Sequence, residues 1–403
     1  MSGKEINNVV YSNFLNVDYL PEEDLYVYQR RTPRYRLNII GAGMIGQEHL
    51  RVTLMEGRAA IYGIYDTSEH SIRKMQAEYQ RVRPGAEPLK VYETLTDACN
   101  DPAVDGLIIC TPNYTHINIV REAVKSGKHI LMEKPMVTRL ADAFEMLKLT
   151  KDYPAVFQVG LQYRYKAIYS EARKEVLEHR AIGNVKSIMI VEHRLPFLDK
   201  IHQWNKFSKY SGGTLVEKCC HYFDLFNLFA QSKPKSVYAV GSQAVNFVGF
   251  EYGGETSDIL DNAVVTVVYE NGVKCNFNLC MFSPQFFEEI TLCGDEGRLR
   301  ASENQNYLPD TGLETRFELL CADNRPSMIS KPCYPSTIQN SGHYGGTFFE
   351  HRYFVDNMDG RKTDTATVEE GFWSIIVGIA AERSVRTGKI VQIDELLAEY
   401  SAE

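Results

Sequence analysis

Apolar positions along this chain of 403 residues follow two different patterns, and the change comes near residue 153. From residue 35 to about 152, short apolar runs of strand length, such as 59–65, alternate with helical patterns, such as 138–151. This alternation predicts a doubly wound parallel sheet with helices between its strands.

Beyond Pro154, longer β-type segments follow one another without helices between them. Strands are expected at 185–194, 236–245, 261–270, 272–281 and 287–294, with a hairpin turn at Asn271-Gly272. Consecutive strands of this kind predict a large, open and mainly antiparallel sheet, which leaves one face available for subunit contact. The polar stretch 301–346 is expected to form irregular loops, and 368–386 a final helix.

The first apolar run, which ends at Ile40, leads into a glycine turn with the sequence Gly41-Ala42-Gly43-Met44-Ile45-Gly46. Glycines at this spacing, after a strand and before a helix (47–56), are typical of a dinucleotide-binding site. Gly41 permits the tight turn, Gly43 lets phosphates approach the backbone, and Gly46 lets the helix pack close to the strand. The N–H groups of Met44 and Ile45 would then face the pyrophosphate at the helix N-terminus.

Asp66 ends the next strand, twenty residues after Gly46. A carboxylate there would accept hydrogen bonds from the ribose hydroxyls of an adenosine. The alternative is that Asp66 only caps the helix that starts near Ser68. Because an acid repels a 2′-phosphate and no arginine follows in 67–70, the sequence favours NAD over NADP as the cofactor.

The chain is long for a single hydrophobic core, so two domains are expected. We predict an N-terminal arm (1–34), a dinucleotide-binding Rossmann domain (35–153) and a substrate-binding and oligomerisation domain of the α+β type (154–403). The arm is rich in aromatic residues, so it is expected to pack on a neighbouring subunit or on the flank of its own domain.

Composition excludes several classes of partner. The net charge of −8, without any block of basic residues, argues against a nucleic-acid partner. The nine cysteines form no disulfide framework, which is typical of a reduced compartment. No apolar stretch reaches transmembrane length, and the N-terminus lacks the apolar core of a signal peptide. These features predict a cytoplasmic enzyme without a membrane partner.

Two loops at the carboxyl ends of predicted parallel strands carry candidate cofactor ligands. Ligands bind at these ends in open α/β sheets. The candidates are Thr111, Pro112, Asn113 and His116 after the strand 104–110, and Glu133 and Lys134 after the strand 129–132. Since Lys134 stands between an acid and a proline at a strand end, a functional role is favoured over that of an ordinary surface lysine.

A second glycine turn, Gly212-Gly213, enters a helix on which Glu217, His221 and Asp224 share one face. Titratable groups on an otherwise apolar helix are costly to bury without a purpose. Thr214 and Glu217 also have the spacing of a capping box, so Glu217 is either a cap or a site residue. His221 is expected to be catalytic, the alternative being a satisfied core histidine. Adjacent cysteines 219 and 220 lack metal-ligand spacing, so no metal is predicted.

These motifs, in this order, resemble the Gfo/Idh/MocA oxidoreductases, which use NAD or NADP and include the glucose–fructose oxidoreductase and inositol 2-dehydrogenase types. The resemblance runs from about Arg36 to Gly388. It implies a Rossmann domain followed by a domain with an open sheet, usually paired into homodimers or homotetramers. It also implies that Lys134 bridges the substrate and the nicotinamide ribose and that His221 is the catalytic histidine. Glu217 stands where many members have Asp.

The predicted reaction transfers a hydride between nicotinamide and a secondary hydroxyl of a sugar, glycoside or cyclitol. His221 would act as the general base, Lys134 would stabilise the developing oxyanion, and Glu217 or Asp224 would orient His221. Gln162 is expected near the cofactor. The residues expected to line the substrate site are Lys134, Arg164, His193, Trp204, Glu217, His221 and His343. Tyr163 or Tyr165 would add an aromatic face for a sugar, or would belong to the core.

Two other functions remain open at this point. A glycosidase that retains NAD could use the same oxidation transiently to eliminate a glycosidic bond. A regulatory protein could bind NAD without catalysis, but the presence of both Lys134 and His221 argues against this alternative.

Overall fold

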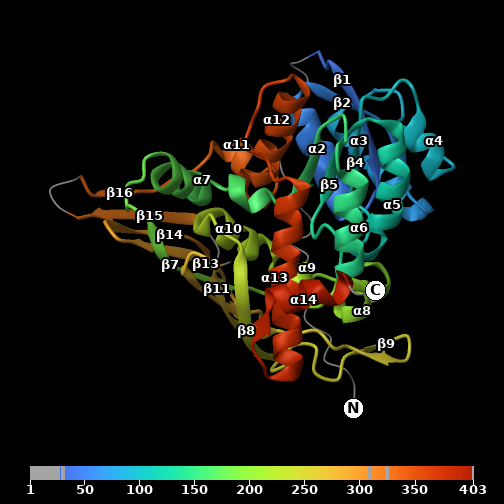
Figure 1. The fold of residues 1–403 in the computed structure, drawn as a ribbon. Coiled ribbons are helices and arrows are strands. Elements are labelled where there is room, and N and C mark those ends of the chain that lie inside the picture. Colours follow the sequence, from blue (N-terminus) through green and yellow to red (C-terminus); the bar gives the residue numbers. More distant parts are fainter. Residues whose placement is uncertain (1–27, 29–31, 307–310, 323–325, 402–403) are drawn as a thin grey trace.

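The computed structural model describes Tyr28 and residues 32–306, 311–322 and 326–401. The predicted arm (1–34) therefore lies almost entirely outside the described residues. The described chain forms two large sheets with helices packed against them, and one small two-stranded sheet (Figure 1).

The first sheet contains six parallel strands among the described residues, in the spatial order β3-β2-β1-β4-β5-β6. Its strands are β1 Tyr35–Ile40, β2 Ala59–Tyr65, β3 Lys90–Val91, β4 Gly106–Ile109, β5 His129–Glu133 and β6 Phe157–Gly160. The predicted doubly wound sheet is confirmed. Leu37, Asn38, Ile39 and Ile40 are all buried, because helices cover both faces of the sheet. Asn38 is the polar exception in this strand, and its side-chain amide donates to the carbonyl oxygen of Ala98 at 2.7 Å.

The helices of this part alternate with the strands. They are α2 Met44–Glu56, α3 Glu69–Val82, α4 Leu95–Asn100, α5 His116–Ala123 and α6 Leu140–Thr150, with short 3₁₀ turns η2 Asn113–Thr115 and η3 Val124–Ser126. Ile39 packs into the apolar cluster that contains Leu50 of α2, whereas Ile40 packs into the cluster that contains Ile117 of α5. Strands β1, β4 and β5 thus contribute buried side chains to two layers of core.

The second sheet has nine strands among the described residues, in the order β16-β15-β14-β13-β7-β12-β11-β8-β17. They are β7 Val185–His193, β8 Pro234–Ser242, β11 Asn262–Tyr269, β12 Lys274–Cys280, β13 Phe286–Gly294, β14 Gly297–Gln305, β15 Glu314–Cys321, β16 Met328–Ser330 and β17 Val391–Gln392. Only the pair β7–β12 is parallel, so the predicted mainly antiparallel sheet is confirmed. A small hairpin, β9 Glu251–Tyr252 and β10 Glu255–Thr256, stands apart.

The prediction that 301–346 is irregular was wrong for part of that stretch. It contains the end of β14 and all of β15 and β16, and Phe317 and Leu319 point into the core. The outward positions of these strands are mostly charged or polar, which hides the alternation that marks a half-buried strand.

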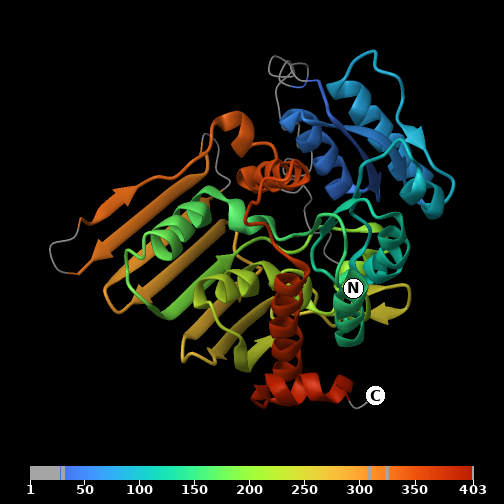
Figure 2. The same cartoon turned by 45° about the horizontal axis from the view of Figure 1, so that its top comes forward.

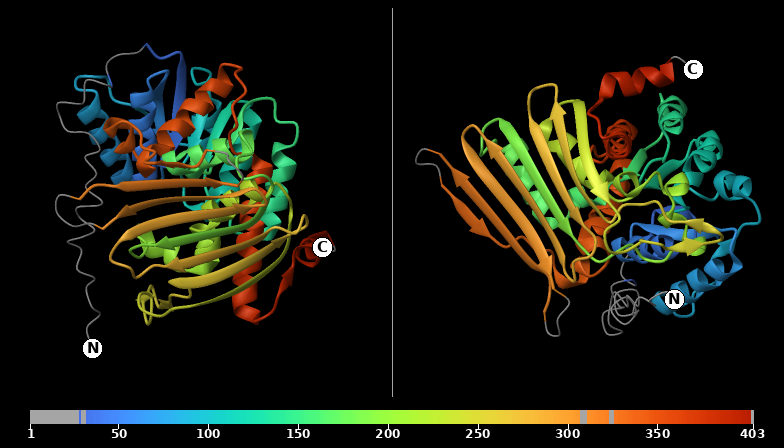
Figure 3. Two further views of the ribbon diagram at one scale, coloured as in Figure 1. Left: turned by 90° about the vertical axis from the view of Figure 1, so that its left-hand side faces the viewer. Right: turned by 90° about the horizontal axis from the view of Figure 1, so that it is seen from below.

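Helices cover one face of the large sheet (Figures 2 and 3). The helices packed against its strands are α7 Ala167–Arg173, α10 Cys220–Ala230 and α13 Val368–Thr387. The other helical elements of this part are the 3₁₀ turns η4 Gln162–Tyr165, η6 Ile201–Lys206 and η7 His343–Gly345, the π-helical turn η5 Lys174–Glu178, and α8 Ser208–Ser211, α9 Thr214–Glu217, α11 Ser336–Gln339, α12 Gly346–Met358 and α14 Ile393–Ser401. On the opposite face, large apolar side chains such as Met189 and Val240 are about half exposed.

The expected boundary at residue 153 divides the first sheet. Strand β6 (157–160) pairs with β5 and completes that sheet, so the dinucleotide-binding part continues past 153. In addition, α12 from the C-terminal half packs beside α2, and Tyr35 Oη donates to Asp359 Oδ1 at 2.8 Å. The two parts are therefore held together by chain segments far apart in sequence.

All nine cysteines carry free thiols in the structure. Within the described part of the chain, none of the helices combines the length and apolar character that a membrane crossing requires.

Candidate active site

The glycine turn at the end of β1 has the geometry that a dinucleotide requires. Gly41 has φ +104°, and a Cβ there would come within 2.7 Å of the backbone carbonyl carbon of Cys110. A Cβ on Gly46 would collide with the carbonyl oxygen of Gly41. A Cβ on Gly43 would meet no atom within 4 Å, so only at this glycine is the space above the turn open. The first and third glycines are required by the fold, and the second leaves room for a phosphate at the start of α2.

Asp66 lies beside this turn. Its Oδ2 accepts a hydrogen bond from the N–H of Ala42 at 2.7 Å, and its Oδ1 accepts one from the N–H of Ser68 at 2.7 Å. Ser68, not Asp66, is the N-cap of α3, because its hydroxyl accepts from Ser71 N. The simple capping alternative for Asp66 is therefore wrong. Its role toward the ribose stays a prediction.

His116 joins the two loops that carry the other cofactor candidates. Its ring nitrogens lie 3.0 Å from the carbonyl oxygens of Thr111 and Pro135, so one imidazole ties the loop after β4 to the loop after β5. Burial lowers the pKa of His116, which is fully enclosed. Asn113 is buried beside it, whereas Thr111 and Pro112 are partly exposed. This geometry gives His116 a positioning function.

Lys134 is not a surface lysine, since only 16% of its side chain is exposed. Its Nζ donates to the carbonyl oxygen of Glu217 at 3.2 Å and lies 3.9 Å from Glu217 Oε1. Burial alone would lower the pKa of Lys134, but the charges of Glu217 and Glu133 hold it above its usual value. Lys134 is therefore a fixed positive charge where the two parts of the chain meet.

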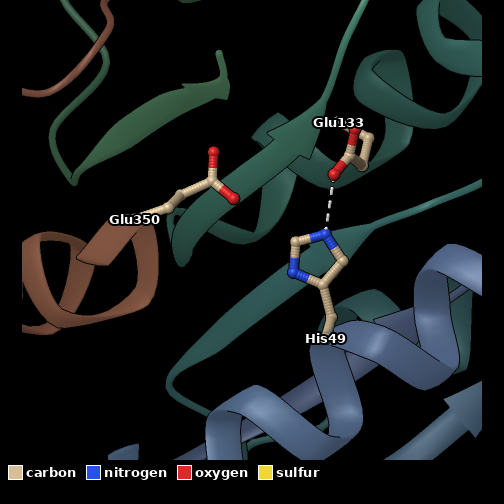
Figure 4. A group of neighbouring side chains, drawn as sticks. All are labelled: His49, Glu133 and Glu350. Atoms are coloured by element: carbon tan, nitrogen blue, oxygen red, sulfur yellow. Dashed lines mark hydrogen bonds and ion pairs between the residues drawn. The ribbon is translucent and has the colours of Figure 1, made fainter. Parts of the chain in front are cut away.

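Glu133 lies in a buried group with His49 and Glu350 (Figure 4). Its Oε1 lies 2.8 Å from His49 Nε2. One ring nitrogen of His49 and one carboxylate oxygen each of Glu133 and Glu350 lie within 4.8 Å of one another. Burial would raise the pKa of Glu133, but the hydrogen bond from His49 holds it below its usual value. Burial raises the pKa of Glu350 well above its usual value, and Glu133 adds to the rise. An ionised Glu133 beside a neutral Glu350 accounts for the charges of this group.

The helix predicted to carry Glu217, His221 and Asp224 on one face is broken between α9 and α10, so the prediction of one continuous helix was wrong. The capping box was wrong as well: the Thr214 hydroxyl donates to Leu260 O, and the N–H of Leu215 donates to Glu382 Oε1 at 2.8 Å. Because Glu382 satisfies the helix start, Glu217 is free to face Lys134.

His221 is enclosed in α10, and its Nδ1 has no hydrogen-bond partner among the described residues. Its ring lies flat on that of Tyr163. Burial lowers the pKa of His221 well below its usual value, and the positive charges of Lys134, Lys218 and His343 add to this effect. The imidazole is thus neutral and ready to accept a proton.

Asp224 forms its ion pair with Arg164 and not with His221. The guanidinium Nε donates to Asp224 Oδ2 at 2.6 Å, and Nη1 donates to Glu370 Oε1 at 2.8 Å. Both side chains of the Arg164–Asp224 pair are 1% exposed. The expectations that Arg164 lines the substrate site and that Asp224 orients His221 are therefore corrected: the two form a buried structural ion pair.

The remaining candidates lie at different depths. His193 is on the open face of the large sheet with its ring 6.0 Å from that of Phe287, because side chains alternate along β7 and the inward position is Glu192. The expectation that His193 lines the site is corrected.

Trp204 is buried against Tyr114, and His343 pairs with Glu48 at 2.7 Å. Gln162 is buried, and its Oε1 has no partner among the described residues.

Sequence reasoning missed a set of buried charges beside His221. Lys218 Nζ donates to Tyr163 Oη at 2.6 Å and lies 3.0 Å from Glu192 Oε1. Lys166 Nζ lies 4.4 Å from the centre of the Tyr163 ring and pairs with Glu288 at 2.6 Å and with Glu303. The sequence could have indicated these buried charges, because the acids occupy inward positions of strands whose other inward residues are apolar.

The glycine turn leaves room for the phosphates of a dinucleotide, and the second part of the chain places a neutral histidine near a lysine. These two features together define a nicotinamide-dependent dehydrogenase. Comparison with known proteins agrees. A model of an oxidoreductase family with an NAD-binding Rossmann fold matches residues 35–161, and a model of the C-terminal alpha/beta domain of the same family matches 174–393. The chain belongs to the Gfo/Idh/MocA oxidoreductase family, as the sequence motifs predicted, and its cofactor is NAD.

Similar proteins include dehydrogenases of cyclic polyols. The chain is 26% identical to a myo-inositol 2-dehydrogenase of Thermotoga maritima over 90% of this chain and 99% of the relative. It is 22% identical to the NAD(+)-dependent scyllo-inositol 2-dehydrogenase of Bacillus subtilis over 89% and 96% of the two chains. A levoglucosan dehydrogenase solved with NADH has the same fold, with a TM-score of 0.71 and 18% identity over 89% of this chain and 99% of that one.

Proposed function

We propose that this enzyme oxidises a secondary hydroxyl of a sugar, glycoside or cyclitol with NAD. The observation that carries the proposal is a cationic lysine beside a neutral, enclosed histidine. Lys134 is held by Glu217 at 3.2 Å, and its charge helps to keep the pKa of His221 low. The relatives named as myo- and scyllo-inositol 2-dehydrogenases support a polyhydroxylated ring as the substrate. Relatives with these names do not favour the glycosidase or the regulatory protein.

Each residue has a distinct task in this reaction. His221 accepts the proton of the substrate hydroxyl, since its imidazole is neutral at rest. Lys134 donates a hydrogen bond to the same oxygen and stabilises the negative charge that develops there. Glu217 fixes the ammonium of Lys134 through its backbone carbonyl and its carboxylate. Bound NAD supplies the acceptor for the hydride. Gly43, Asp66 and the loops joined by His116 would hold it.

Substitution of Lys134 tests this proposal. We expect Lys134→Ala to lower kcat by about 10²–10⁴-fold with any inositol, sugar or glycoside that the wild type oxidises, because oxyanion stabilisation is lost. The binding of NADH, followed by its fluorescence, should change far less. Lys125→Ala is the matched control, since Lys125 is an exposed lysine of the same domain. Unchanged turnover in Lys134→Ala would overturn the assignment.

The open face of the large sheet supports self-association. Met189, Tyr238, Val240 and Ile329 expose large apolar surfaces there, and such patches mark interaction sites. We infer a homodimer or homotetramer built through this face. Val240→Glu should lower the mass measured by light scattering, and an unchanged mass would count against this interface. The nine free thiols support a cytoplasmic location.

A further inference from the structure

A second histidine lies close to the candidate active site and is held by a carboxylate. His343 Nδ1 lies 2.7 Å from Glu48 Oε1, and Glu48 belongs to α2, the helix that begins at the glycine turn. Thr347 Oγ1 donates to the same carboxylate oxygen at 2.6 Å. His221 Nδ1, in contrast, has no hydrogen-bond partner among the described residues. Of these two histidines, His343 is the one that an acid orients.

The backbone around His343 fixes this side chain where the two parts of the chain meet. Four successive residues, 342–345, have φ values of +148°, +41°, +52° and +90°. Residues other than glycine seldom adopt such values, and they keep them where the surroundings impose them, often at ligand sites. Here His343 binds α2, whereas the Tyr344 hydroxyl donates to Gln305 Oε1 of β14 at 3.0 Å. The loop is thus attached to both parts of the chain.

Tyr163 connects His343 with the candidate base. The centre of the Tyr163 ring lies 3.9 Å from that of His221 and 6.3 Å from that of His343, so both imidazoles neighbour one phenol ring. The side chain of His343 is 28% exposed, whereas His221 is 2% exposed. A sugar or cyclitol ring that reaches His221 from the solvent therefore meets His343 on its more open side.

The Nε2 atom of His343 is the part of this side chain that remains for a ligand. Its Nδ1 faces Glu48 and Thr347, and no hydrogen bond from the described residues reaches Nε2. Nε2 accepts a hydrogen bond when the imidazole is neutral and donates one when it is charged. A hydroxyl group matches both states, since it can donate and accept. Because Glu48 balances the charge of a protonated ring, the pair favours a neutral hydroxyl over an anion.

We propose that His343, positioned by Glu48, binds a second hydroxyl of the substrate, other than the one that is oxidised. This inference rests on the proposed function, because it specifies how the same site selects its substrate. A site built to bind a hydroxyl rejects the analogue that lacks it, since its polar group is then left unpaired. The enzyme therefore requires two hydroxyls, one for Lys134 and His221 and one for His343.

Deoxy analogues test the inference. With saturating NAD, kcat and KM are measured for D-glucose, D-galactose and myo-inositol and for the monodeoxy derivatives of each. His343→Asn removes the ring nitrogen, and asparagine tolerates the left-handed backbone. Glu48→Gln keeps the shape of the side chain but removes its charge. His179→Asn is the matched control, because His179 is an exposed histidine whose Nδ1 lies 3.2 Å from Glu175 Oε1.

For the wild type, we expect one derivative that keeps the oxidised hydroxyl to lose about tenfold to a hundredfold in kcat/KM relative to its parent. His343→Asn should lower kcat/KM of the parent by a similar factor, mainly through KM, and should leave that derivative at its low value. Glu48→Gln should act in the same direction, and its effect should not add to that of His343→Asn, because the two residues act as a unit. His179→Asn should match the wild type.

Two results would overturn the inference and leave the dehydrogenase assignment intact. One is a wild type that oxidises all such derivatives as well as their parent, and the other is a His343→Asn variant that affects parent and derivatives equally. If no compound yields NADH, the melting temperature of the NADH-bound enzyme decides. Stabilisation by a parent compound that is absent with one derivative and in His343→Asn supports the hydroxyl contact and counts against the proposed function. No stabilisation by any compound overturns both.

Discussion

The phenol ring of Tyr163 lies flat on the imidazole of His221, with ring centres 3.9 Å apart and planes inclined by 8°. Lys218 Nζ donates to the phenol oxygen at 2.6 Å, which helps to fix the ring. No carboxylate among the described residues binds His221 Nδ1. The orientation of the His221 imidazole therefore comes from stacking, without the carboxylate at Nδ1 that a catalytic triad has.

The pH dependence of kcat/KM follows from this arrangement. Burial lowers the pKa of His221 below its usual value of 6.5, and nearby cations lower it further. Since a base with a depressed pKa is protonated only at lower pH, activity should stay constant through neutral pH and fall only well below pH 6.5. A decline centred at or above that value would contradict the assignment of His221 as the base.

Lys218 offers a direct test of the electrostatic cause. Lys218→Met removes one of the charges that disfavour the imidazolium, so the acidic limb of kcat/KM should move upward by about one pH unit or less. Lys125→Met, which removes an exposed charge, should leave the limb in place. An unmoved limb in Lys218→Met would show that the charge of Lys218 does not contribute to the low pKa of His221.

The glycine turn predicts opposite results for two similar substitutions. Gly43→Ala places a methyl group in open space, so the protein should keep its melting temperature but lose NADH affinity by about tenfold or more. Gly46→Ala drives a methyl group into the carbonyl of Gly41, so it should destabilise the fold by about 1–3 kcal/mol. Thermal unfolding and NADH fluorescence distinguish the two. Equal effects on both readouts would contradict the separate roles.

The Arg164–Asp224 pair predicts a stability defect. Arg164→Met leaves the carboxylate of Asp224 buried without its cation, which costs about 3–5 kcal/mol when a buried pair is broken on one side. Urea unfolding measures the loss, and the double variant Arg164→Met with Asp224→Leu should recover part of it. A raised KM with unchanged stability would instead restore Arg164 as a substrate residue.

Local patterns predicted the fold and pointed to the candidate reacting groups, but they did not predict the surroundings of these groups. The strand 59–65 and the turn through Gly41 and Gly46 depend on neighbours in sequence, so apolar period and glycine spacing located them. The partner of Asp224 comes from 60 residues away, so spacing on one helix could not identify Arg164. The choice of His193 over Glu192 depended on strand phase, where a shift of one residue exchanges the two faces.

The buried triad Lys166, Glu288 and Glu303 has one cation for two acids. Lys166 holds the pKa of Glu288 below its usual value, against the effect of burial. Burial raises the pKa of Glu303 to about 7, against the pull of Lys166, and the charge of Glu288 adds to the rise. The pair of acids therefore keeps a proton near neutral pH, and this proton is bound more tightly in the folded protein than in the unfolded chain.

Glu303 consequently contributes stability that is fully present below about pH 4.5 and is lost as the pH rises through about 7. Glu303→Gln, which cannot ionise, should match the wild type at pH 5 and exceed its unfolding free energy at pH 8 by about 1–3 kcal/mol. Urea unfolding at both pH values measures the difference, with the exposed Glu314→Gln as control. Destabilisation by Glu303→Gln at pH 8 would mean that the ionised pair with Lys166 outweighs the repulsion from Glu288.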